Sequence, residues 1–131
     1  MGLLNRQQIL DSDDRRTERV AVPEWGGEVL IRGLSGTDRD EFEASLQVKN
    51  GKKRDVNLRN VRAKLVVLCL VDETGKPLFS IEDIQRLGNK SAAALGRCFD
   101  RAKQLSGLGD EDIDELAKNS ATDQSDVSIS A

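Results

Sequence analysis

The run from Val20 to Leu46 limits the fold more than any other part of this 131-residue chain. Its sequence is VAVPEWGGEVLIRGLSGTDRDEFEASL, in which two short runs of alternating residues flank a proline and two glycines. Alternation with period two is typical of a half-buried strand, and proline and glycine are typical of the turn between strands. We therefore predict a β-hairpin in which Arg16–Pro23 pairs with Glu28–Leu34, followed by a helix from Thr37 to Gln47.

Apolar residues recur at helical spacing through much of the remaining chain. One stripe follows a predicted N-cap at Asn57 and ends in the run LVVLCLV, and a second stripe follows Ser91. LVVLCLV could also be a buried strand, but we predict helix because the pattern is unbroken from Asn57. Ser80 and Asp83 have the spacing of a capping box, which predicts a further helix ending at Gly88. These patterns predict burial of six residues: Leu65, Leu68, Cys69, Leu95, Phe99 and Ala102.

The predicted fold class is α+β, as a helix-dominated single domain with one N-terminal β-hairpin. The domain is expected to span residues 1–118. Residues 119–131, NSATDQSDVSISA, are small and polar and offer few anchors for a core, so we predict a disordered C-terminal tail. A short helix is expected at Leu3–Leu10, and a loop at Lys49–Asp55, where Asn50-Gly51 is a turn signal.

The chain contains no histidine, which excludes Ser–His and Cys–His catalysis and every zinc site that needs a histidine ligand. Cys69 and Cys98 lie within apolar helical patterns, which favours two buried, reduced thiols. A resemblance to a calcium loop at Asp110, and to phosphate loops at Gly51 and Gly75, fails because required residues are missing. We predict a protein that is not an enzyme and uses no metal or cofactor.

Charge and hydropathy bear on the partners and the compartment. The net charge is −3, and no signal peptide or apolar run of membrane-spanning length is present, so we expect a cytosolic chain without a membrane partner. The basic stretch around Lys52-Lys53-Arg54 lacks the interleaved aromatic residues of many nucleic-acid surfaces. A solvated loop is the simpler interpretation, and nucleic acid is not expected as a partner.

Three segments together resemble the phage tail assembly chaperones of siphophages that infect actinobacteria. They cover most of the chain from Leu3 to Asn119 and read VPEWGGEVLIRGLSGTDRDEFEASL, VNLRNVRAKLVVLCLVDETGKPLF and KSAAALGRCFDRAKQLSGLGDEDIDELAKN. The resemblance implies a non-enzymatic helper of tail morphogenesis in the host cytoplasm. Such a protein binds the tape measure protein, helps recruit tail tube subunits around it, and leaves before the virion matures. The resemblance assigns no binding residue.

Two other functions stay open on the sequence alone: a virion structural protein such as a head–tail connector, and a small nucleic-acid-binding regulator. The helical apolar faces suit a groove that docks an amphipathic partner helix. We expect half-exposed apolar residues near element ends to line it, namely Trp25, Phe42, Leu46, Leu108, Ile113 and Leu116. The acidic cluster Asp110–Glu115 would steer basic partner segments toward the groove. Stoichiometry and self-association stay open.

Overall fold

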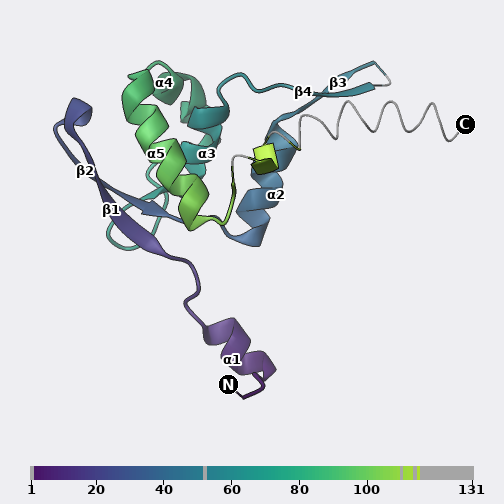
Figure 1. Cartoon of the computed structure of the whole chain (residues 1–131), viewed down its shortest axis with the longest axis vertical. Coiled ribbons are helices and arrows are strands. Elements are labelled where there is room, and N and C mark those ends of the chain that lie inside the picture. The colour runs from purple at the N-terminus through teal and green to yellow at the C-terminus, as the bar shows by residue number, and fades with distance from the viewer. Residues whose placement is uncertain (1, 52, 110, 114, 116–131) are drawn as a thin grey trace, which may run out of the picture.

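The computed structural model describes residues 2–51, 53–109, 111–113 and 115. Helices and small antiparallel sheets form an α+β domain, which confirms the predicted fold class (Figure 1). Within these ranges, no helix is long and apolar enough to cross a membrane. The predicted polar tail, residues 119–131, lies outside the described residues.

The predicted N-terminal hairpin is present. Strands β1 (Thr17–Val22) and β2 (Gly27–Arg32) pair antiparallel, with ends that differ by one or two residues from the prediction. A short 3-10 helix, η1 (Pro23–Trp25), forms the turn, and Gly26 follows it at a φ of 76°. Glycine reaches this left-handed conformation at little cost because it has no Cβ, so the local sequence determines where the hairpin turns.

A third strand completes the sheet. Helix α3 (Val61–Cys69) ends two residues before LVVLCLV does, and the chain continues as β5 (Leu70–Val71). Strand β5 pairs antiparallel with β2, so the sheet order is β1-β2-β5. The prediction of helix is correct up to Cys69 and wrong beyond it, because the free edge of β2 offers backbone hydrogen bonds to the chain as it leaves the helix.

A second hairpin replaces the loop predicted at Lys49–Asp55. Strands β3 (Gln47–Asn50) and β4 (Lys53–Val56) pair antiparallel around Gly51, whose φ is 69°. The hairpin extends from the end of α2 (Gly36–Ser45), away from the helical body (Figure 1). The loop prediction is wrong because these strands are largely polar in sequence, so no alternation of apolar and polar residues reveals them.

Capping side chains fix several helix starts. The capping box of Ser80 and Asp83 is confirmed and opens η2 (Ile81–Asp83), which leads into α4 (Ile84–Gly88). Ser91 caps α5 (Ala92–Leu105), as predicted. Two predicted starts differ from the structure: α2 begins at Gly36, one residue before Thr37, with Ser35 as its cap, and α3 begins after Asn60 rather than after Asn57. Asn57 instead accepts a hydrogen bond from the backbone N–H of Arg59.

The core lies between the sheet and the helices α2, α3 and α5. Buried residues from all of these elements form one apolar cluster, which includes Leu65, Cys69, Leu95, Phe99 and Ala102 as predicted. Leu68 is the exception, because it is partly exposed on a face of α3 that no described element fully covers.

The end of β2 packs tightly against the end of α5. A Cβ added to Gly33 would lie 2.9 Å from the carbonyl carbon of Leu105, whereas a Cβ added to Gly36 would meet no described atom within 4 Å. Backbone atoms cannot move aside as a flexible side chain can. The close approach of β2 and α5 therefore requires glycine at position 33.

We expect Gly33→Ala to lower the free energy of unfolding by about 1–3 kcal/mol or more, because it overpacks this contact. Gly36→Ala is the matched control, and should change stability by less than about 1 kcal/mol, in the stabilising direction. Urea titration followed by circular dichroism measures both. Equal stability of the two variants would contradict the close packing of Gly33 against Leu105.

Both cysteines are buried and free. Burial raises the pKa of the Cys69 thiol from its ordinary value of 9.0 to about 12, although a hydrogen bond from Ser106 opposes the shift. Burial raises the pKa of Cys98 as well. Such thiols stay protonated near neutral pH, and reagents that attack the thiolate reach them slowly.

A thiol whose pKa is higher in the folded state stabilises the fold fully below its unfolded pKa, and that contribution is lost as the pH rises from 9.0 toward 12. We expect the wild-type melting temperature to fall more steeply above about pH 9 than that of Cys69→Ala. Labelling of both thiols near pH 7 should be slow until the protein is unfolded. Parallel slopes for the two proteins, or rapid native labelling, would contradict this assignment.

Candidate partner-binding groove

Three of the residues expected to line a groove belong to the core. Phe42 and Leu46 are 2% and 0% exposed, and Leu108 is 6% exposed. Phe42 and Leu46 lie four residues apart, so they share the face of α2 that is turned into the core. Leu108 joins the same core just after α5. The expectation that these residues are half-exposed is therefore wrong, because position near the end of an element does not determine exposure.

Of the other three residues, the two that the structure describes, Trp25 and Ile113, do not share one surface. Trp25 is partly buried against the core beside a salt bridge in which Arg97 contacts both carboxylate oxygens of Glu24, at 2.5 and 3.1 Å. Ile113 lines a separate hollow beside Phe99, and Trp25 is not part of that lining. Leu116 lies outside the described residues. Trp25 therefore shields part of the core from water and is not an exposed binding residue.

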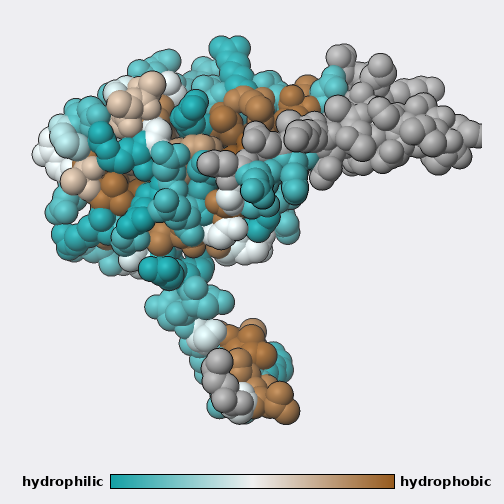
Figure 2. Space-filling model, in the orientation of Figure 1, coloured by the Kyte–Doolittle hydropathy of each residue, from teal (hydrophilic) through white to brown (hydrophobic). Residues whose placement is uncertain are grey.

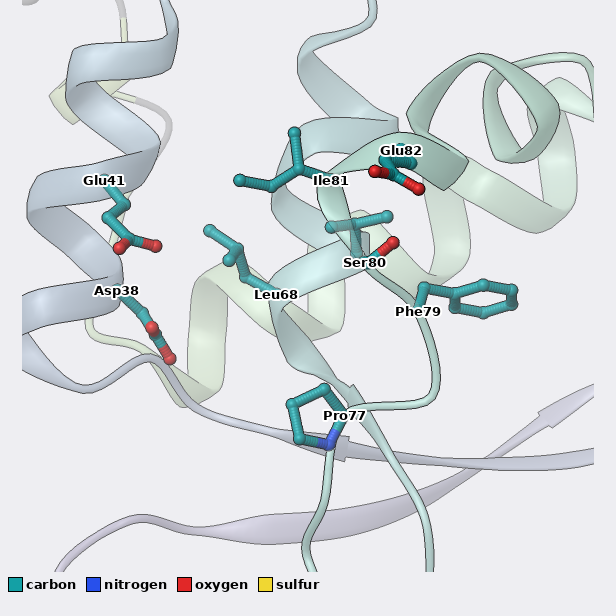
Figure 3. A pocket seen from close by; sticks show the side chains of 9 residues that line it. Asp38, Glu41, Leu68, Pro77, Phe79, Ser80, Ile81 and Glu82 are labelled. Atoms are coloured by element: carbon teal, nitrogen blue, oxygen red, sulfur yellow. The ribbon is translucent and has the colours of Figure 1, made fainter.

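A groove does lie over the uncovered face of α3 (Figure 3). It has a volume of about 580 Å³ and takes its walls from α2, α3 and the segment from Pro77 to Glu82. Leu68 lies between the carboxylates of α2 on one side and Ile81 on the other. The lining residues are Asp38, Glu41, Val67, Leu68, Pro77, Phe79, Ser80, Ile81 and Glu82.

Local sequence explains the wall formed by Pro77 to Glu82. Asp72 accepts hydrogen bonds at one carboxylate oxygen from the backbone N–H groups of Thr74 and Lys76, which closes the turn after β5. The hydroxyl of Thr74 and these backbone groups hold the pKa of Asp72 below its ordinary value. The backbone N–H of Leu78 then donates to the carbonyl of Leu70 at 3.0 Å, so the returning chain lies beside β5.

The capping box at Ser80 fixes the direction in which the chain continues. The backbone N–H of Ser80 donates to a carboxylate oxygen of Asp83 at 2.9 Å, and η2 starts at Ile81. Ile81 is 68% exposed at this position and lines the groove. Together with Leu68 it gives the groove an apolar surface that water still reaches.

Carboxylates line the rim of the groove. Asp38 pairs with Arg15 at 3.5 Å, while Glu41 and Glu82 form no ion pair with any residue that the structure describes. An apolar floor with unpaired acids at its edge suits a helix that has an apolar stripe and basic flanks. Among the described residues, no group of three or more acidic or cysteine side chains could hold a metal ion.

Leu68, Phe79 and Ile81 line the groove but were not predicted as binding residues from the sequence. The helical stripe of α3 correctly placed Leu68 on an apolar helix, but periodicity does not show that a covering element is missing. The capping box at Ser80 predicts where η2 begins, and the isoleucine at its first helical position is the sequence signal for an apolar side chain at the groove. Exposure at both positions depends on contacts between distant parts of the chain.

Comparison with known proteins identifies the family. The profile of the family described as phage tail assembly chaperone matches residues 5–119 of this chain. The structure resembles that of the bacteriophage HK97 tail assembly chaperone, with a TM-score of 0.55 and 20% sequence identity. This similarity covers 79% of the present chain and 95% of the HK97 chain, and at such low identity it bears on the fold alone.

Comparison with curated proteins finds no match. Because the family profile spans nearly all of the described residues, this chain belongs to the phage tail assembly chaperone family.

Proposed function

We propose that this chain binds the tape measure protein during tail assembly, and that the groove over Leu68 is its binding site. The observation that carries the proposal is an apolar groove, with Ile81 exposed at its edge, that the described part of the chain leaves uncovered. Family membership makes a protein of the tail the natural partner. A tape measure protein is long and helical, and it exposes apolar stripes before the tube covers it.

The groove fits one such stripe in physical terms. Apolar side chains of a partner helix would displace water from Leu68 and Ile81, and basic side chains beside the stripe would face Glu41 and Glu82. A groove of this size holds only a short stretch of helix, so each contact would be weak. Several copies bound along one long client would together keep it soluble and could still be removed.

The same proposal includes the later steps of assembly. We infer that the bound chain acts in the host cytoplasm without catalysis, helps bring tail tube subunits to the tape measure protein, and is absent from the finished virion. A virion structural protein, such as a head–tail connector, would instead stay in the particle. The two functions differ in where the chain ends up.

We expect Ile81→Asp to reduce capture of a tape measure segment about 10- to 100-fold, because it places a charge where an apolar contact forms. Leu58→Asp is the matched control, since Leu58 is an exposed leucine outside the groove lining. Co-expression with tape measure fragments, followed by affinity capture, measures binding, and circular dichroism checks folding. Undiminished capture by Ile81→Asp would exclude this groove, and no capture by the wild-type chain would refute the proposed function.

Mass spectrometry of purified virions tests the assembly role separately. The chain should be abundant in infected cells and missing from mature particles, while the tape measure and tube proteins are detected in both. Tail tube subunits serve as the internal control for recovery. A stoichiometric amount of the chain in purified virions would favour the structural alternative.

A further inference from the structure

Helix α1 (Arg6–Asp11) stands clear of the rest of the molecule, at the end of a short connector (Figure 1). Its surface is apolar over a wide area (Figure 2). The exposed fractions are 102% for Leu3, 68% for Leu4, 55% for Ile9 and 61% for Leu10. No residue of α1 is buried by the described part of the chain. We refer to residues 3–11 as the arm.

The arm needs a surface to pack against. A helix of six residues is too short to be stable alone in water, because the cost of nucleation exceeds the gain from so few hydrogen bonds. Its capping box is complete: the backbone N–H of Asn5 donates to Gln8 at 2.9 Å, and the backbone N–H of Gln8 donates to Asn5 at 2.8 Å. A cap determines where the helix begins, but it does not remove four aliphatic side chains from water.

The connector between the arm and β1 is fastened to the body of the molecule at the end of β2 and at Asp38 on the groove rim. Arg15 donates to the carbonyl of Gly33 at 2.9 Å and pairs with Asp38, while Asp13 lies 3.8 Å from Arg32. These contacts fasten the chain to the end of β2 only a few residues after α1. As described, the arm contributes no residue to the groove lining.

We propose that the arm of one copy docks in the groove of a second copy of this chain. The two surfaces are complementary, since the arm presents aliphatic side chains and the groove offers Leu68, Phe79 and Ile81. Their charges also match: Arg6 forms no ion pair among the described residues, and neither do Glu41 and Glu82 at the groove rim. Docking would pair the cation of the arm with the acids of the rim.

Arm and groove are different surfaces, so this contact is heterologous. Every copy carries one of each, and docking one arm leaves a free groove on one copy and a free arm on the other. The arrangement requires nothing beyond this chain, and it does not rest on the identity of the client that the groove binds.

Sedimentation equilibrium of the purified full chain, without any client, tests the proposal. The wild type should self-associate, and Ile9→Asp with Leu10→Asp in the arm should weaken association about 100-fold, as should Ile81→Asp in the groove. Leu58→Asp, outside both surfaces, should associate as the wild type does. Because the described part of the chain buries no residue of α1, the arm variant should unfold at the wild-type temperature.

Mixing the arm variant with the groove variant separates docking between copies from folding back within one copy. The mixture retains one intact arm and one intact groove, so it should form a 1:1 complex that grows no further. Arg6→Glu should also weaken association, and Glu41→Lys with Glu82→Lys should restore it. A wild-type chain that stays monomeric, an arm variant that associates normally, or a mixture without a complex would overturn the proposal. Capture of a tape measure segment is a separate measurement with the client present, so failure of self-association and failure of the proposed function are distinguishable.

Discussion

The burial of α3 and β5 on nearly every side is the constraint on which the rest of this structure depends. α3 packs against α5, α4 and α2, and β5 pairs with β2. The segment formed by α3 and β5 therefore contacts both the N-terminal hairpin and the C-terminal helix α5. A run that is apolar on all faces can be stable in water only if it is surrounded in this way. Its buried residues are Ala63, Leu65, Val66, Val67, Cys69, Leu70 and Val71.

The groove follows from incomplete enclosure of α3 at Leu68. α2 reaches α3 from one side, and the segment after Pro77 returns beside β5 on the other, but neither covers Leu68. The elements on both sides present carboxylates toward the gap, partly because Asp38 and Glu82 lie in the first turns of their helices, where the helix dipole favours negative charge. An apolar floor and an acidic rim thus arise from ordinary packing and capping.

Features that depend on neighbouring residues could be predicted from the sequence, while features that depend on distant contacts could not. The turn after Pro23 and the capping box at Ser80 are determined by residues within one turn, and both were predicted. Strand β5 exists because β2 has a free edge some 40 residues earlier in the chain. The burial of Phe42 and the partial exposure of Leu68 likewise depend on which element packs where. Three predicted site residues, Phe42, Leu46 and Leu108, therefore belong to the core, and the groove over Leu68 was not predicted.

Arm and client would share one groove if both proposals hold, and the difference in their lengths determines which of them stays bound. The arm offers one short helix with a single cation, Arg6, and therefore one weak contact for each groove. A long amphipathic client offers many such segments on one chain, so that binding to one groove raises the effective concentration of the next segment near a neighbouring groove. The client would then displace arms from several copies at once, although no single segment need bind more tightly than an arm. Copies held together by their arms would already present grooves close to one another, which is the arrangement that a multivalent client binds best.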